Sequence, residues 1–297
     1  MTGNAIARPL EPRNWWAVPL FLMAWIVLGC GFLDAQIRMD LLNAGKGKGF
    51  RLLYLPNGKY LKMVSLGFSP LLADLIYLWS IQYFSDPGSI QKREYLEHIY
   101  GSVIAELDPH YLDPYLTGGL IMAMEMGEVE MALRLLDKGM KNNPDSWILA
   151  ADAGFYAYLQ LKDFQRAESY FQRAMEIEGA PPILSRLRAG MMQKRGAKKD
   201  AYLTWLEIYE TSQDDYIRNV SFRHVHDLKI EIDLEQLQNT IAIYRERVGE
   251  FPDRLDRLVE SGWMKSLPTD PRELPYLYDP GTGRVSSATP FALRRGI

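Results

Sequence analysis

The sequence predicts an all-α protein built from stacked helical pairs, because one residue pattern recurs at a nearly constant spacing. The same three positions of the pattern hold Gly127, Ala132 and Gly139, then Lys162, Ala167 and Ala174, and then Gly196 and Ala201. A recurrence of this length is typical of a solenoid in which each repeat contributes two helices. The prolines at 109 and 144 stand at the same spacing and extend the pattern by one earlier unit.

Composition limits the function classes. Apolar residues make up 47% of the 297 residues and charged residues 24%, which are values of a globular protein. The net charge of -3 gives no reason to expect nucleic acid as a partner. Cys30 is the single cysteine, so neither an intrachain disulfide nor a cysteine metal cluster is expected.

The N-terminal part predicts a membrane anchor. A polar leader, residues 1–14, precedes residues 15–33, which carry no charge and start with Trp15 and Trp16 at the place of an aromatic interface anchor. As a helix this run is about 28 Å long, close to the thickness of the bilayer hydrocarbon. We therefore expect contact with the lipid bilayer through residues 15–33, in a single-pass protein of the bacterial inner (cytoplasmic) membrane whose soluble domain faces the periplasm. Lipoprotein processing at Cys30 is the alternative, because the preceding residues resemble a lipobox.

A basic linker, residues 34–56, leads into a predicted solenoid, residues 57–211. Its first long helix, Leu71 to Phe84, contains Asp74 as its one charge, so we expect neighbours to cover it nearly all round. At about 14 residues it is too short to be a second span. We interpret it as the first helix of a degenerate repeat whose second helix ends near Leu107.

The repeats resemble the tetratricopeptide repeat (TPR), most clearly over residues 113–147, 148–181 and 182–211. The resemblance implies that Gly127 lies in the turn between two helices and that Pro144 ends the second helix. It also implies that the two helices touch at Ala132 and Gly139. Two features depart from the family pattern. The early tryptophan is missing, and the glycine of the eighth position stands one residue early, at Gly119 and Gly154.

This resemblance implies a protein-binding groove on the concave face, which the first helix of each repeat lines. The residues implied to face it are Thr117, Met124, Asp152, Tyr156, Arg186 and Gln193. They combine aromatic, flexible apolar and charged groups, as a groove for a protein segment does. Packing against neighbouring helices is the other interpretation for each of them.

Residues 212–297 are expected to form two helices and a small α+β C-terminal cap. The two helices would divide near residues 231–233, where Asp233 would be an N-cap with Gln236 completing a capping box. The proline-rich segment after Phe251 resembles the region that follows the long helix in major pseudopilins of type II secretion. In that family the terminal loop can hold calcium, but Asp270, Asp279 and Thr282 alone supply too few oxygens.

We find no motif that predicts catalysis or cofactor binding. His224 and His226 with Asp227 are a weak metal-binding pattern, because residues two apart on a helix point to different faces, and we expect surface histidines. An unrecognised enzymatic site at these residues is the remaining catalytic alternative. We expect no cofactor, no metal and no enzyme activity.

The function expected from the sequence is that of a membrane-anchored scaffold or adaptor. It would bind other proteins, membrane or envelope proteins in particular, during assembly of a bacterial envelope complex, with pilus or secretion machinery as one candidate. The alternative is a permanent accessory structural subunit of a large membrane protein complex.

Overall fold

The computed structural model describes Met23, residues 55–84 and residues 93–293. The residues from 55 onward belong to one compact unit, 53–297. The predicted leader and nearly all of the predicted span and linker lie outside the described residues, although Met23 is helical. Among the described residues we find no helix that is both long and apolar enough to cross a membrane.

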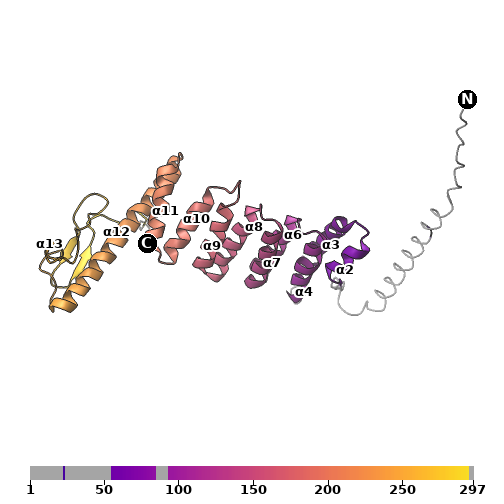
Figure 1. Ribbon diagram of the computed structural model, residues 1–297, viewed down its shortest axis with the longest axis horizontal. Helices are drawn as coiled ribbons and strands as arrows, with labels where there is room; N and C mark the ends of the chain where they lie inside the picture. Colours follow the sequence, from indigo (N-terminus) through magenta and orange to yellow (C-terminus); the bar gives the residue numbers. More distant parts are fainter. Residues whose placement is uncertain (1–22, 24–54, 85–92, 294–297) are drawn as a thin grey trace, which may run out of the picture. The chain divides into compact units, whose positions relative to one another are not determined.

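The unit is a succession of helices, each packed against the helices next to it in sequence (Figure 1). It begins with α2 (Gly58–Val64), α3 (Ser69–Phe84) and a helix in three parts, α4 (Arg93–Glu97), η2 (His98–Ile104) and α5 (Ala105–Leu107). The repeats follow as α6 (Leu112–Leu120) with η3 (Ile121–Glu125), α7 (Val129–Asn142), α8 (Trp147–Tyr156) with η4 (Ala157–Leu161), α9 (Phe164–Met175), α10 (Ile183–Lys194) and α11 (Lys198–Thr211). The segments marked η are π-helical turns.

The turn between the two helices of each repeat has the same geometry three times. The backbone angle φ is +72° at Gly127, +57° at Lys162 and +87° at Gly196. These residues end the first helices η3, η4 and α10 and lead into α7, α9 and α11. A left-handed residue at equivalent positions of successive helical pairs makes the architecture TPR-like.

Small residues allow the helices to approach closely. A Cβ atom on Gly139 of α7 would lie 2.9 Å from the ring of Tyr115 on α6. One on Gly154 of α8 would lie 2.7 Å from the ring of Phe171 on α9. Tyr115 and Phe171 are almost wholly buried, so each ring fills the space that the glycine leaves free.

The π-helical turns explain why the repeat spacing varies. A π-turn accommodates one residue more than an α-helical turn, and the first helices of the 35-residue steps end in η3 and η4, whereas α10 in the 34-residue step has none. In η3, for example, the N–H of Met126 donates to the carbonyl of Ile121 at 3.1 Å. The extra residue lies between the family's glycine position and the second helix, and this places Gly119 and Gly154 one residue early.

The prediction that neighbours cover α3 nearly all round is wrong. Ala73, Ile76 and Ser80 are buried, and the Ser80 hydroxyl donates to the Tyr100 hydroxyl of η2 at 3.0 Å. By contrast, Leu71, Leu75 and Leu78, a stripe along the helix, are each more than half exposed. Among the described residues, α3 packs mainly on η2 and α5, so its other side has no helix against it.

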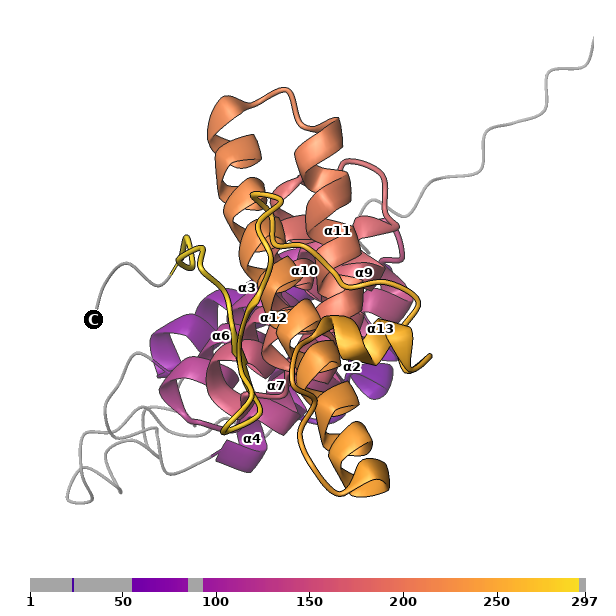
Figure 2. The same cartoon turned by 90° about the vertical axis from the view of Figure 1, so that its left-hand side faces the viewer.

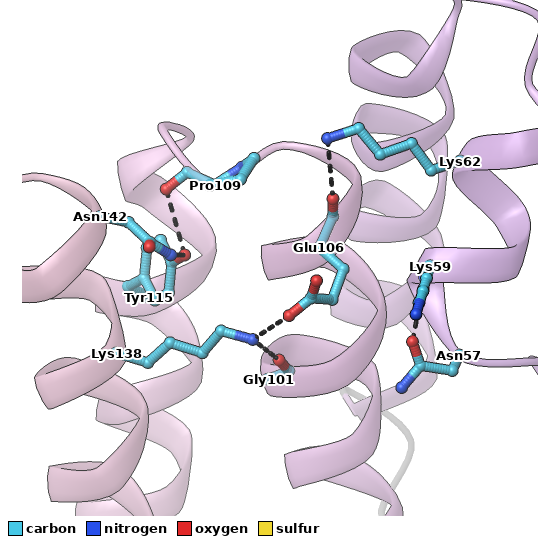
Figure 3. Close-up of polar contacts among 9 residues, drawn as sticks. All are labelled: Asn57, Lys59, Lys62, Gly101, Glu106, Pro109, Tyr115, Lys138 and Asn142. Atoms are coloured by element: carbon cyan, nitrogen blue, oxygen red, sulfur yellow. Dashed lines mark hydrogen bonds and ion pairs between the residues drawn. The ribbon is translucent and has the colours of Figure 1, made fainter.

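Polar contacts join α2, the η2–α5 helix and α7 (Figure 3). The Lys138 ammonium of α7 donates to the Gly101 carbonyl at 2.8 Å and to the Glu106 carboxylate at 2.5 Å. The Lys62 ammonium of α2 donates to the carbonyl of Glu106 at 3.4 Å. Glu106 therefore connects the first short helix to the first clear repeat.

Two helices were expected between 214 and 248, but a single helix, α12 (Asp215–Val248), spans this region. No glycine or proline interrupts it, and Asp233 is not an N-cap. The Asp233 carboxylate instead accepts from the Lys229 ammonium one turn earlier and from the Tyr276 hydroxyl at 2.8 Å. The Asp233 side chain thus makes tertiary contacts, whereas the capping-box pattern predicted that it would cap the start of a helix.

The C-terminal segment forms a small α+β cap along α12, as expected (Figure 2). It contains α13 (Asp256–Glu260) and an antiparallel hairpin, β1 (Leu277–Asp279) and β2 (Arg284–Ser286), with Tyr278 opposite Val285. Leu237, Ile241 and Leu258 are fully buried in the core between this cap and α12. The Asp227 carboxylate accepts from the backbone N–H groups of Ala292 and Leu293 at 2.7 and 2.8 Å.

Replacing Lys162 by glycine is expected to stabilise the protein. A residue with a side chain costs about 1 kcal/mol in the left-handed region, and glycine removes this cost. Glycine also raises the backbone entropy of the unfolded chain, which cancels part of the gain. We therefore expect a net increase of about 0.5 kcal/mol in the free energy of unfolding. Urea unfolding of the full chain in detergent measures it. Arg173→Gly, at an exposed position within α9, is the matched control and should cost about 1 kcal/mol. A destabilised Lys162→Gly variant would contradict the strain argument.

Candidate protein-binding groove

The residues implied to line the groove occupy repeating positions on the first helices. Thr117 of α6, Asp152 of α8 and Arg186 of α10 are equivalent under the repeat spacing. Met124, Leu159 and Gln193 are a second equivalent set, close to the ends of these helices. Each set thus places one side chain per repeat along the first helices.

Two of the expected groove residues are engaged in contacts between helices. The Thr117 hydroxyl lies 2.8 Å from the Tyr77 hydroxyl of α3. The Gln193 side-chain oxygen lies 3.1 Å from Nδ1 of His224 on α12, and the His224 ring stacks on Trp205 with centroids 4.0 Å apart. Thr117 and Gln193 therefore help to hold neighbouring repeats together.

Asp152 has a different environment. Burial raises the pKa of its carboxyl from 3.8 to about 6. Within the part of the chain that the structure describes, no hydrogen-bond donor or cation contacts this carboxylate. Tyr156, one turn later, is buried, and its pKa is raised by burial and by the nearby Asp152. A partly desolvated charge without a protein partner is a feature of binding sites.

Arg186 stands at the equivalent position one repeat later. Its Nε is buried, and among the described residues it has no hydrogen-bond acceptor. Two nearby arginines lie close to the Glu168 carboxylate, Arg195 at 2.5 Å and Arg188 at 3.9 Å, although Nε of Arg188 also has no hydrogen-bond acceptor among the described residues. The solenoid thus presents an acidic and a basic group on consecutive first helices.

Exposed apolar side chains accompany these two charges. Leu120 and Met124 of the α6–η3 helix and Leu159 of η4 are each more than 40% exposed. The side-chain amide of Gln160 donates to the Met124 sulfur at 3.1 Å, which places the two π-helical turns next to each other. Our sequence reasoning named Met124 but missed Leu120 and Leu159, although the repeat spacing applied to Met124 leads to Leu159.

His224 and His226 pack among other residues of the protein. His226 is buried, contrary to the expected surface position, and its Nδ1 lies 2.9 Å from the Asp227 carboxylate. Burial lowers the pKa of His224, which stacks on Trp205. Among the described residues, no group of three or more His, Cys, Asp or Glu side chains could hold a metal ion.

Asp270 and Asp279, the residues considered for calcium, already accept protein hydrogen bonds. The Asp270 carboxylate accepts from the backbone N–H groups of Arg272 and Leu274, both at 2.9 Å, and from the Thr289 hydroxyl at 2.5 Å. Asp279 accepts from Thr282 at 2.6 Å. Their carboxylates stabilise the turns of the cap.

Helical pairs, left-handed turns and close helix contacts at small residues define a TPR-like solenoid. No family model and no curated protein matches the sequence. Among solved structures, the chain is similar to a thermophilic TPR protein from Thermus thermophilus, with 18% identity and a TM-score of 0.33. The match covers 56% of this chain and 94% of that one.

Replacing Asp152 by asparagine should stabilise the protein in a pH-dependent way. Because the pKa is higher in the folded than in the unfolded state, the folded carboxyl binds its proton more tightly. The free energy of unfolding should therefore fall as pH rises from about 4 to 6 and stay lowered above that range. Asp152→Asn removes this cost, which amounts to roughly 1–3 kcal/mol at pH 7.5.

Urea unfolding at several pH values measures this difference, which should shrink as the pH is lowered from 6 towards 4. The exposed Asp145→Asn change is the control and should alter the free energy of unfolding by less than about 0.5 kcal/mol. An Asp152→Asn variant that is no more stable than the wild type at pH 7.5 would show that the carboxylate is stabilised in the folded protein.

Proposed function

We propose that this protein is a membrane-anchored TPR-like scaffold that binds segments of other proteins along its first helices. The observation that carries the proposal is the pair of charges without protein partners, Asp152 and Arg186, beside the exposed Leu120, Met124 and Leu159. A segment with an apolar residue between a basic and an acidic group would satisfy both charges and cover the apolar side chains. Binding alone, without a chemical step, is the proposed mechanism.

The anchor is part of the same proposal. The uncharged run at 15–33 supports insertion into the bacterial inner membrane, with the soluble domain in the periplasm. Tethering to the bilayer raises the effective concentration of the groove towards membrane-bound clients. Envelope proteins are therefore the proposed partners, and assembly of an envelope complex is the proposed role.

Pilus or secretion machinery is the proposed class of client complex. The support is the order of elements at the C-terminus, in which the long helix α12 precedes the short helix α13, a proline turn and a hairpin. This is the order that the resemblance to major pseudopilins implies. The continuous α12 fits this resemblance better than the two helices expected from the sequence.

The test of client binding is affinity purification of the tagged full-length protein from its native host in mild detergent, followed by quantitative mass spectrometry. We expect substoichiometric clients whose recovery falls about tenfold in Leu120→Glu and Leu159→Glu variants, the loss expected from a residue worth about 1.4 kcal/mol. Leu203→Glu, an apolar-to-acidic change at an exposed position of α11, is the control and should leave recovery unchanged.

A fixed set of membrane subunits at constant ratio, insensitive to the groove variants, would favour a permanent accessory subunit instead. Alkaline extraction of native membranes tests the anchor separately. Release of the protein into the soluble fraction would contradict a transmembrane span, whatever the result for the groove.

A further inference from the structure

The corner between α2 and α3 exposes an unusual number of large apolar side chains. The exposed fractions are 74% for Met63, 70% for Val64, 80% for Leu66 and 68% for Phe68. We call these four residues the apolar corner. They lie within six consecutive positions, whereas exposed apolar residues on soluble proteins are usually scattered singly.

The apolar corner is held in place by the helices beneath it. A Cβ atom on Gly58, at the start of α2, would lie 2.3 Å from the Val103 carbonyl, so α2 packs directly on the backbone of η2. Just before α2, the Leu55 carbonyl lies 2.8 Å from Nε2 of His98. Lys62 fixes the far side of α2 through the Glu106 carbonyl (Figure 3). The apolar side chains are thus presented by a packed element.

The backbone at the apolar corner is strained. Leu66 has φ +50°, in the left-handed region that a leucine seldom adopts, and Gly67 follows with φ +94°. Leu66 is also the most exposed of the four side chains. Strain of this kind persists where the surrounding structure enforces it, and it is concentrated at functional sites.

The surroundings of the apolar corner favour a lipid surface as its occupant. Lys59 and Lys62 are exposed on α2, and Tyr60 between them is 65% exposed. Cationic and aromatic residues beside apolar ones are the composition of a segment that lies in a membrane interface. Asp74 borders the leucine stripe of α3, and this acidic residue limits the proposed contact to the corner and the first turn of α3.

The position of the apolar corner in the chain also favours a lipid surface. Residues 34–54 separate the end of the predicted span from Leu55, and a chain of that length reaches at most about 70 Å. It carries Arg38, Lys46, Lys48 and Arg51, which complement anionic headgroups. The apolar corner therefore belongs to the first element that the structure describes after the predicted anchor.

We propose that the apolar corner inserts into the headgroup region of the bilayer and fixes the orientation of the solenoid relative to the membrane. This inference rests on the proposed anchor at 15–33. Shallow insertion of about 5–10 Å is expected, as for other interfacial segments. Two contacts with the membrane, the span and the apolar corner, would restrict how the groove faces the bilayer.

The test uses the full chain with Cys30→Ser, so that a single new cysteine can carry an environment-sensitive fluorophore. The label is placed at Leu66→Cys or, as the matched control, at Leu203→Cys, which is 61% exposed on α11. Both proteins are reconstituted into vesicles of phosphatidylcholine and phosphatidylglycerol. We expect lipids brominated near the headgroup end of their chains to quench about half of the fluorescence at position 66 and almost none at position 203.

Co-flotation with the vesicles separates the two proposals. A protein that does not float lacks the anchor, and the proposed function then fails together with this inference. A protein that floats while its position-66 label reports water overturns the inference alone. So does a blue-shifted label that brominated lipid does not quench, because a second copy or another part of the chain then covers the corner.

Two further variants examine the cause of insertion. Phe68→Glu should abolish quenching of the label at position 66, and Lys59→Gln should weaken it in vesicles that contain phosphatidylglycerol. Both changes affect exposed side chains, so circular dichroism should show an unchanged helical fold. Quenching that persists in the Phe68→Glu variant would overturn the inference.

Discussion

The packing of one large ring or leucine into the space beside a glycine is the constraint on which this structure depends. Gly139 receives Tyr115, and Gly154 receives Phe171, so that the two helices of a pair meet without an intervening side chain. Polar groups connect neighbouring repeats, as the ion pair of Arg166 with Glu130 at 2.7 Å illustrates. Because a single pair cannot bury its apolar faces alone, these contacts make each repeat depend on the next.

The surface proposed to bind clients is related to the same packing. Tyr115 of α6 and Phe171 of α9 fill the interface within their helical pairs, whereas the residues proposed to bind clients occupy other positions of the first helices. Asp152 and Arg186 lie at equivalent positions of consecutive first helices, where the Asp152 carboxyl is partly desolvated by burial and Nε of Arg186 is buried. Leu120 and Leu159 lie at or next to the π-helical turns, where the extra residue widens the helix. The departures from an ideal repeat therefore fall within the surface proposed to bind clients.

Much of the helical-pair architecture could be predicted from the sequence, because small residues and turns recur at a spacing that only stacked pairs explain. The contacts of the residues expected to face a groove could not be predicted. Thr117 and Gln193 are used between helices, and no local pattern reveals that Tyr77 and His224 would be within reach. The division of α12 failed for a related reason. A capping box is a local signal, whereas Asp233 bonds to Tyr276, a residue of the distant cap.

The two ends of the described solenoid differ in how far their terminal helices are covered. At the C-terminal end, α12 covers α11 and is itself covered by the cap, whose buried core includes Leu237 and Leu258. The other end begins with α2 and α3, where leucines and the apolar corner remain exposed. Terminal repeats of soluble solenoids carry a polar outer face. An apolar face at the end nearest the predicted anchor is the reverse of that rule, and a bilayer beside the first helices would remove the contradiction.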